Sequence, residues 1–520
     1  MRRLLLLIAV TLAAGLVCCG LAASSAAAAP PPMFHPSAGP LALLATQQAE
    51  LTASDATANC EFGTTVALSG NTALIGAPLK TVAGSQTAGA VYVFVRPGAS
   101  WSEQTELSDP DSGTGHYFGS AIALSGDIAI VGAPGEGAGG TVYVFTRSGS
   151  SWSQSEKLTD PDAIDELAGD EFGTSLALSG DTLLVGADSA TAGGSDEIGA
   201  VYVYTRSGNS WSKVARLTAA DAAYGDSFGS AVALDGQTAL VGAPGKTVAS
   251  QSLAGATYVF SGAGASWSQK AKLADPAPAA MDYFGSRLAL SGGTALISTP
   301  YAVVSGKQNV GSVYVYTGSG AVWQKRAKLA DPAAAANDYF GLALALEGGR
   351  ALIGAPLAKV GVTSNAGVAY VYTGSGAIWS QQAKLADPDP APADRFGGPF
   401  ALSGNTALIG AIGRAVGGQN QAGAVYVEDL GGSPTPVAPK LGKLSPTKGK
   451  PGCIVTLTGA HFGATRGTSK VLFAGKAAKK YLSWSDTKIK LRLPPAKKGK
   501  LAVKVKTAAG TSNVKYFTRR

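Results

Sequence analysis

The chain has 520 residues, too many for one ordinary hydrophobic core, so several domains or a repeat array are expected. Its 69 glycines and 27 prolines supply many turns and argue against long helices, which favours an all-β protein. The net charge of +8 is unevenly distributed, because residues 441–520 contain 19 Lys and Arg against the single Asp486, a net +18, and the rest of the chain is acidic.

Residues 1–28 have the pattern of a secretory signal peptide, with two arginines, an apolar run from Leu4 to Val17 and then small residues. Residues 29–45 would follow as a flexible N-terminal segment. The apolar run is short for a bilayer span and no later run replaces it, so no transmembrane segment is expected after cleavage. Lipidation is disfavoured because the segment 16–19 lacks the small residue usual in a lipobox. A secreted or cell-surface location is therefore predicted.

Few residues are available for thiol or metal chemistry. After cleavage only Cys60 and Cys453 remain, one in each of the two regions defined below, so a disulfide framework is not expected. The whole chain has three histidines, His35, His116 and His461, too few to give the thiols partners. The cysteines are interpreted as structural or incidental.

A repeat of fixed period occupies most of the chain. A Phe-Gly pair recurs every 54 or 56 residues, which indicates a repeat architecture. Each period contains four strand-length apolar pieces that end at Gly, Pro, Asp or Ser, as in FGSAIALSG, DIAIVGAP, GTVYVFTRSG and SWSQSEKLTDP of the second copy, and four strands make one small sheet. The pairs begin at Phe62, Phe118, Phe172, Phe228, Phe284, Phe340 and Phe396.

The two ends of the array indicate how it closes. The seventh copy stops near Leu430 without a fourth piece, whereas residues 46–52 align with the fourth pieces of the other copies. A linear array has no reason to divide one repeat between its ends, but a ring closes when the first strand completes the last sheet. The sequence therefore predicts an all-β fold with a seven-bladed β-propeller at residues 46–430.

Gly-Ala-Pro follows the Phe-Gly pair in four copies, and together they resemble the FG-GAP repeat of integrin α-chain propellers, above all its bacterial secreted form. Integrin-type repeats often carry a calcium loop of the D-x-D-x-D-G kind. Here the corresponding loops, such as LSGNT and LSGDI, offer one acidic or amide residue each, which is too few for a hard cation. No metal site and no cofactor are therefore expected. The tripeptides are Gly76–Pro78, Gly132–Pro134, Gly242–Pro244 and Gly354–Pro356.

An Asp stands two residues before the Phe-Gly pair in five copies, and Cys60 and His116 replace it in two. These carboxylates could form a ring that binds cations or polyamines, but recurrence favours a local role in which each Asp accepts a hydrogen bond within its own turn. Likewise, the Trp that recurs in the fourth piece is interpreted as packing rather than sugar stacking. The Asp residues are Asp170, Asp226, Asp282, Asp338 and Asp394, and the Trp residues are Trp101, Trp152, Trp211, Trp267, Trp323 and Trp379.

Positions that break the repeat are the better candidates for a propeller ligand site, although loop drift explains them equally well. Asp188 replaces the Pro of Gly-Ala-Pro in the third copy, with Asp196 and Glu197 in the next loop. The fifth copy reads Ser298–Tyr301 and the seventh Gly410–Ile412. No single position is selected, and the propeller ligand stays open.

Residues 431–440 are a Gly and Pro linker, and residues 441–520 form a second unit of short alternating runs, a small β-sandwich pattern. Leu444–Pro446, Val455–Gly459, Trp484–Thr487 and Gly510–Asn513 resemble the IPT/TIG domain, which implies an immunoglobulin-like fold. That family includes intracellular DNA-binding members and extracellular members. The signal peptide favours the second group, so nucleic acid is not expected as a partner.

Neither a nucleophile with its base nor a phosphate loop can be assembled, so an enzyme is not expected. The favoured hypothesis is an exported binding or adhesion scaffold whose partner is an anionic cell-envelope polysaccharide or an extracellular protein or glycan. The alternative is a structural envelope protein that associates with itself. The oligomeric state stays open. The candidate polyanion-binding residues are Lys479, Lys480, Lys497, Lys498 and Lys500.

Overall fold

The computed structural model describes residues 45–160, 162, 169–191, 198–331, 333–431, 440–460, 469–484, 488–507 and 510–520. These residues form 38 β-strands and no α-helix, as the glycine content predicts. The described residues contain no helix with the length and hydropathy of a membrane span. The predicted signal peptide, almost all of the segment 29–45 and most of the linker 431–440 lie outside the described residues.

The first six blades are antiparallel four-stranded sheets formed by consecutive strands. Blade 1 comprises β2 (Thr65–Ser69), β3 (Thr72–Ala77), β4 (Ala90–Val95) and β5 (Ser102–Ser108). Blade 2 comprises β6 (Ala121–Ser125), β7 (Ile128–Ala133), β8 (Thr141–Ser148) and β9 (Ser151–Thr159). Blade 3 comprises β10 (Phe172–Ser179), β11 (Thr182–Ala187), β12 (Ala200–Ser207) and β13 (Ser210–Leu217).

The same order of strands continues through the second half of the array. Blade 4 comprises β14 (Ala231–Asp235), β15 (Thr238–Ala243), β16 (Ala256–Ala263) and β17 (Ser266–Ala274). Blade 5 comprises β18 (Leu288–Ser291), β19 (Thr294–Thr299), β20 (Ser312–Ser319) and β21 (Val322–Leu329). Blade 6 comprises β22 (Ala343–Glu347), β23 (Arg350–Ala355), β24 (Val368–Ser375) and β25 (Ile378–Leu385).

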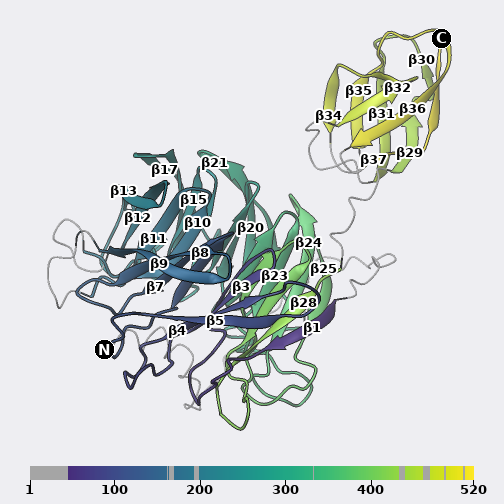
Figure 1. Cartoon of the computed structure of the whole chain (residues 1–520). Helices are drawn as coiled ribbons and strands as arrows, with labels where there is room; N and C mark the ends of the chain where they lie inside the picture. Colours follow the sequence, from purple (N-terminus) through teal and green to yellow (C-terminus); the bar gives the residue numbers. More distant parts are fainter. Residues whose placement is uncertain are drawn as a thin grey trace, which may run out of the picture. The chain divides into compact units, whose positions relative to one another are not determined.

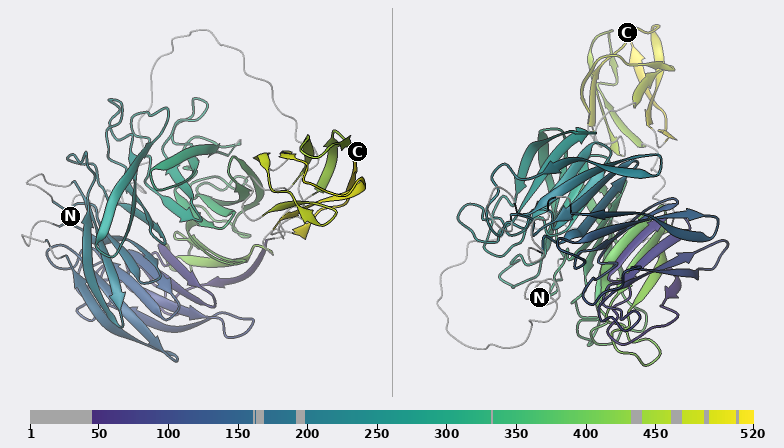
Figure 2. Two further views of the ribbon diagram at one scale, coloured as in Figure 1. Left: turned by 90° about the horizontal axis from the view of Figure 1, so that it is seen from above. Right: turned by 60° about the vertical axis from the view of Figure 1, so that its left-hand side comes forward.

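Blade 7 takes its outer strand from the other end of the chain. It comprises β26 (Phe396–Ser403), β27 (Thr406–Ala411), β28 (Ala424–Asp429) and β1 (Thr46–Leu51). The two strands pair antiparallel, and in Figure 1 purple β1 lies beside green β28. The innermost strand of each blade lies beside that of the next, and β26 lies beside β2, so the blades form a closed ring (Figures 1 and 2). The predicted seven-bladed propeller and its closing strand are thus present.

The hydrophobic core of the propeller lies between neighbouring blades. Third strands such as β8 are apolar at successive positions because both of their faces are covered. Between blades 1 and 2, Val91 and Leu107 pack with Phe118, Val131 and Tyr143 in one buried cluster. The predicted packing role of the repeated Trp is confirmed, since each Trp from the fourth pieces lies in or against such a cluster. A blade alone would expose these faces, so its stability depends on its neighbours.

The Phe-Gly and Gly-Ala-Pro motifs are parts of one packing arrangement. Phe118 is fully buried, and its ring meets that of Tyr143 edge-on at 5.5 Å between centroids. Gly119 has φ +93 and donates its N–H to the carbonyl of Gly132 at 2.9 Å. A Cβ added at Gly132 would lie 2.2 Å from the carbonyl oxygen of Gly173 in the next blade. Glycine is therefore required where neighbouring inner strands approach each other.

The second unit is a sandwich of two sheets, as the IPT/TIG resemblance implies. One sheet contains β29 (Lys440–Ser445), β31 (Ile454–Ala460), β35 (Lys488–Arg492) and β34 (Tyr481–Trp484). The other contains β30 (Lys448–Gly449), β38 (Lys515–Arg519), β36 (Gly499–Thr507), β32 (Lys470–Phe473) and β33 (Lys476–Ala477), with β37 (Gly510–Thr511) beside β36. Alternation is clear in β36, where Leu501, Val503 and Val505 point into the core and Lys500 and Lys506 are exposed.

A buried carboxylate in the closing blade yields a pH-dependent prediction. Glu428 in β28 stands where the other six blades carry Phe or Tyr, and burial raises its pKa to about 7 from an ordinary value of 4.5. Because the folded state binds this proton more tightly than the unfolded state, the stability of the protein falls as the pH rises from about 4.5 to 7. Glu428→Gln should therefore raise the free energy of unfolding by about 1–3 kcal/mol at pH 8 and leave it unchanged near pH 4.

Urea unfolding of the parent and the Glu428→Gln variant at both pH values measures this difference. Gln421→Glu offers a control, because residue 421 lies in an exposed loop and an added carboxylate there should not change the pH dependence. Equal stability of the Glu428→Gln variant and the parent at pH 8 would contradict the role given to burial.

Candidate functional site

The five predicted polyanion-binding lysines all have exposed side chains in the sandwich. Lys479 and Lys480 immediately precede β34, and Lys497 and Lys498 lie in the loop before β36. Lys500 lies in β36 with its Nζ 4.3 Å from the centroid of the Tyr516 ring. The backbone N–H of Arg492 donates to the carbonyl of Lys480, which joins the start of β34 to the end of β35.

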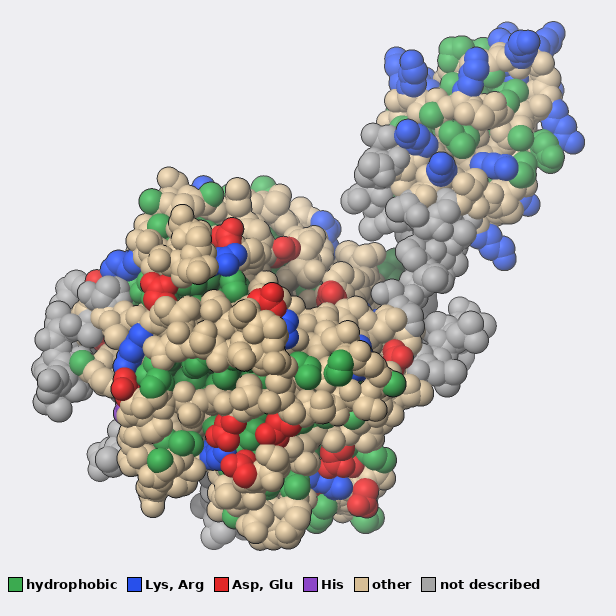
Figure 3. Space-filling view, viewed as in Figure 1, with side chains coloured by type: hydrophobic (Ala, Val, Ile, Leu, Met, Phe, Trp, Pro, Cys, Tyr) green, Lys and Arg blue, Asp and Glu red, His purple; other side chains and the backbone are tan. Residues whose placement is uncertain are grey.

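Among the described residues of the sandwich, no acidic side chain neutralises the lysines and arginines. Its one acidic residue, Asp486, lies outside the described residues, and none of the described side chains of the sandwich is a carboxylate. Every charged side chain visible on the sandwich in Figure 3 is Lys or Arg, whereas the propeller surface carries both signs. The described surface of the sandwich is therefore basic.

The propeller contains a second class of candidate site, repeated at each blade. We call it the junction pocket, and four groups form it. Two are the hydroxyl of the Tyr in the third strand of the blade and an acidic residue that follows the fourth strand of the preceding blade. The other two are the residue two positions before Phe-Gly and the residue two positions after Gly-Ala-Pro. In six blades the Tyr hydroxyl donates to the acid. In order from blade 1, the Tyr–acid pairs are Tyr92–Asp55, Tyr143–Asp109, Tyr202–Asp160, Tyr258–Asp221, Tyr314–Asp275, Tyr370–Asp331 and Tyr426–Asp387.

The residue after Gly-Ala-Pro determines the charge inside each junction pocket. In blade 4 Lys246 lies with its Nζ 2.8 Å from Asp226 Oδ2, and both side chains are more than nine-tenths buried. In blade 7 Arg414 Nη1 lies 3.3 Å from oxygens of both Asp387 and Asp394. Blades 3, 5 and 6 carry alanine at this position and so retain two acids. The position is occupied by Lys80, Glu136, Ala190, Lys246, Ala302, Ala358 and Arg414 in blade order.

The recurrent Asp before Phe-Gly caps its own turn, as predicted from the sequence. Asp226, Asp282, Asp338 and Asp394 each accept the backbone N–H three residues earlier, at 2.6–2.9 Å. Burial raises the pKa of Asp282, Asp338 and Asp394. In blade 3 burial and the neighbouring Asp160 raise the pKa of Asp170 to about 6. The recurrent carboxylates therefore have a local structural function.

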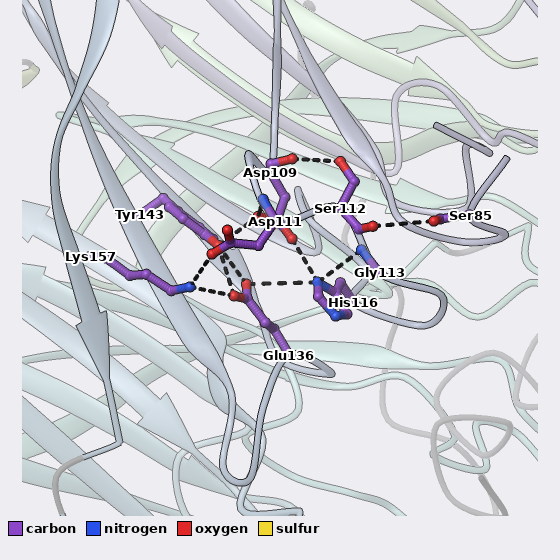
Figure 4. Close-up of polar contacts among 9 residues, drawn as sticks. All are labelled: Ser85, Asp109, Asp111, Ser112, Gly113, His116, Glu136, Tyr143 and Lys157. Atoms are coloured by element: carbon purple, nitrogen blue, oxygen red, sulfur yellow. Dashed lines mark hydrogen bonds and ion pairs between the residues drawn. The ribbon is translucent and has the colours of Figure 1, made fainter. Parts of the chain in front are cut away.

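Blade 2 departs from this pattern, and Figure 4 shows its junction pocket. His116 replaces the capping Asp, and Glu136 is the only carboxylate after Gly-Ala-Pro in any blade. His116 Nδ1 lies 2.6 Å from Asp109 Oδ2 and 3.9 Å from Glu136 Oε2. The hydroxyl of Tyr143 lies 2.6 Å from Asp109 Oδ1 and 2.8 Å from each oxygen of Glu136. Lys157 Nζ reaches Glu136 Oε1 at 2.7 Å from the rim.

Sequence reasoning noted His116 only as a replacement for Asp and did not single out Glu136 or Asp109. The three residues are the one group of His, Cys, Asp or Glu in the described chain whose ligand atoms lie close enough to hold a metal ion, all within 4.8 Å of one another. A comparison of all seven copies at both variable positions would have found the pair. The expectation of no metal site rested on the hairpin loops and on the absence of residues spaced for coordination along the chain, and neither criterion detects three residues from separate segments.

The positions that break the repeat, and the two cysteines, lie in different structural environments. Asp188 is buried, and burial raises its pKa to about 6. The ring of Tyr301 lies between those of Tyr283 and Tyr339, at 5.0 and 5.2 Å between centroids. Asp196 and Glu197 lie outside the described residues, as does His461. Cys60 and Cys453 are both free, in line with the absence of a disulfide framework.

Seven four-stranded sheets closed through β1 and β28 define a seven-bladed propeller, and the two-sheet unit at the other end of the chain is an immunoglobulin-like sandwich. Comparison with known families agrees. The FG-GAP repeat matches residues 45–94, 101–145, 152–204, 211–260, 267–316, 323–372 and 379–427, and the IPT/TIG domain matches residues 439–518. The chain belongs to the FG-GAP repeat family.

Similarity to individual proteins covers less of the chain. A cyclomaltodextrin glucanotransferase of Paenibacillus macerans is 36% identical over 112 residues, which is 22% of this chain and 15% of that protein. Enzymes with the same name from Niallia circulans and Thermoanaerobacterium thermosulfurigenes are 32% and 33% identical over 115 residues, 22% of this chain and 16% of each enzyme. The chain thus spans about one sixth of the length of these relatives.

Among solved structures, a fungal alcohol oxidase of the AA5 family in complex with copper aligns over 92% of this chain and 99% of its own, with 13% identity and a TM-score of 0.45. A match of this score carries no argument about function.

Proposed function

We propose that the protein is an exported, non-enzymatic binding or adhesion scaffold. The propeller loops present an interaction surface, and the basic sandwich contacts an anionic polymer of the cell envelope, such as an acidic polysaccharide. One observation carries the proposal: Lys479, Lys480, Lys497, Lys498 and Lys500 are all exposed on a unit whose described side chains include no carboxylate.

The physical reason is the cost of concentrating charge of one sign. A net +18 within residues 441–520 repels itself, and a polyanion relieves that repulsion. Each lysine that contacts the polymer releases a counterion, so affinity falls steeply with salt concentration. Burial of a specific ligand is not required, which agrees with exposed lysines that lie in two loops and at the start of β36.

The test compares the full chain with a variant in which the five lysines are replaced by Gln. Binding to envelope preparations and to purified acidic polysaccharide is measured over a range of salt concentrations. The slope of log affinity against log salt should become shallower by about one for each lysine in contact. Because all five side chains are exposed, the variant should fold like the parent, with a stability change within about 0.5 kcal/mol per site.

A second variant with Arg at the same five positions is the matched control, because it retains the charge and should keep the parent's slope. Retention of the Gln variant and the parent to the same extent at every salt concentration would refute the proposal. Export is tested by fractionating the source cells into medium, envelope and interior. A structural, self-associating envelope protein would instead sediment as an assembly in the absence of any polymer.

A further inference from the structure

We propose that Asp109, His116 and Glu136 in the junction pocket of blade 2 bind one divalent transition-metal ion, of the class of Zn²⁺. This site is separate from the basic surface of the sandwich and independent of the function proposed for it. Two residue changes distinguish this pocket from the other six: His116 places an imidazole where five blades have a carboxylate, and Glu136 adds a carboxylate where no other blade has one. Unrelated drift in two loops, one before β6 and one after β7, would not be expected to produce that coincidence.

The carboxylates are oriented as ligands by donors of the surrounding fold. Asp109 Oδ1 accepts the Tyr143 hydroxyl at 2.6 Å and the backbone N–H of Asp111 at 2.8 Å, which leaves Oδ2 facing the imidazole. Glu136 Oε1 accepts Lys157, and its Oε2 is the oxygen nearest to the imidazole (Figure 4). Hydrogen bonds of this kind to the outer oxygens of ligands fix their orientation and support metal affinity.

The negative charge of the two buried carboxylates is only partly balanced within the pocket, where Lys157 pairs with Glu136. Tyr143 has one hydroxyl proton but three carboxylate oxygens within 2.8 Å of its oxygen. His116 Nδ1 lies 2.6 Å from Asp109 Oδ2 and 3.3 Å from the backbone N of Gly113, so it can donate to the carboxylate or accept from the N–H but not both at once. Asp109 and Glu136 are 1% and 6% exposed, so water screens them little. A divalent cation among these three ligands would balance the charge of both carboxylates.

The ligand types select the ion. One imidazole nitrogen with two carboxylate oxygens suits Zn²⁺ and its neighbours, whereas Ca²⁺ and Mg²⁺ prefer sites built of oxygen alone. Bonds of about 2.1 Å place ligand atoms roughly 3–4 Å apart. His116 Nδ1 lies 3.9 Å from Glu136 Oε2, within that range, and 2.6 Å from Asp109 Oδ2, so the side chains of His116 and Asp109 must separate by roughly 1 Å when an ion binds. The side chain of His116 is 19% exposed, so the ion and a water ligand can enter from solvent.

The other blades supply substitutions that preserve the fold. Glu136→Ala installs the residue found in three blades, and Glu136→Ala combined with His116→Asp reproduces the Asp and Ala set of blades 3, 5 and 6. Untagged full-length protein is treated with chelator and titrated with Zn²⁺ by calorimetry, and with Co²⁺ as a spectroscopic probe. We expect one high-affinity Zn²⁺ per chain, a Co²⁺ absorption spectrum in the visible range, and a loss of affinity of about 100-fold or more in either variant.

The converse experiment builds the site in another blade. Asp338→His with Ala358→Glu in blade 6 reproduces the blade 2 set beside Asp331, Tyr370 and Lys384, and should raise the stoichiometry from one ion to two. The proposal is overturned if Zn²⁺ does not bind the parent one to one, or if both variants, verified as folded by circular dichroism, bind it as the parent does. It is also overturned if saturating Zn²⁺ leaves the parent's Tm unchanged at constant pH, because an ion bound to the native state must stabilise it.

Discussion

Deletion of β1, residues Thr46–Leu51, is expected to lower the unfolding temperature by about 5 °C or more and to promote aggregation. The pairing of β1 with β28 is the one link that joins the two ends of the propeller chain within a single sheet. Without it, β28 becomes an edge with unpaired N–H and C=O groups, and the ring can open between blades 7 and 1.

The size of the effect follows from what β1 contributes. It pairs with β28 over five residue pairs, from Thr46 with Asp429 to Leu51 with Val425. Leu51 is 4% exposed and packs with Phe62 and Val427 in the core between blades 7 and 1. Hydrogen bonds at about 1 kcal/mol each and the burial of one leucine at about 2 kcal/mol amount to a loss of several kcal/mol.

A chain that begins at residue 42 keeps β1 and serves as the control for truncation as such. Leu51→Ala, which removes the core contact but keeps the backbone pairing, should give a loss of about 2–4 kcal/mol. Calorimetry and light scattering on heating measure the unfolding temperature and aggregation. If the protein without β1 melts at the temperature of the control and stays monomeric, β1 does not hold the ring closed.

Replacement of the buried lysine in the junction pocket of blade 4, Lys246→Met, should destabilise the protein by about 3–5 kcal/mol. Lys246 is the cation nearest to Asp226, which is 3% exposed, and it also donates to the carbonyl of Asp221. Methionine fills the space of the side chain but leaves a buried carboxylate without its charge partner. The cost comes mainly from that uncompensated charge rather than from the lost attraction.

Lys272 is a matched control, because its Nζ lies 2.6 Å from Asp221 in the same pocket but its side chain is 32% exposed. Lys272→Met should cost no more than about 1 kcal/mol. The double variant Lys246→Met with Asp226→Asn removes the orphaned charge and should recover a large part of the loss. Chemical denaturation of the three proteins gives these differences, and equal losses for the two lysine variants would show that burial does not control the effect.

The sequence alone was sufficient to predict the architecture, because a repeat of fixed period is compatible with few folds. Four short apolar pieces per period can only form a small sheet, and apolar residues on both faces of strands such as β8 require a neighbour on each side. The displaced fourth piece at residues 46–52 revealed the closed ring. The capping role of Asp226 and the packing role of Trp211 could also be predicted, since local requirements repeat with the fold.

The proximity of Asp109, His116 and Glu136 in the junction pocket of blade 2 could be seen only in the tertiary structure. Asp109 leaves the outer strand of blade 1, His116 precedes β6, and Glu136 follows β7. Only the stacking of one sheet on the next brings these three segments together beneath the hydroxyl of Tyr143. Sequence periodicity specifies which positions are equivalent between blades, but the distance between positions in different parts of the period depends on how neighbouring sheets pack. The chemical role of a residue that departs from the repeat can therefore be inferred only when the residues around it in space are known.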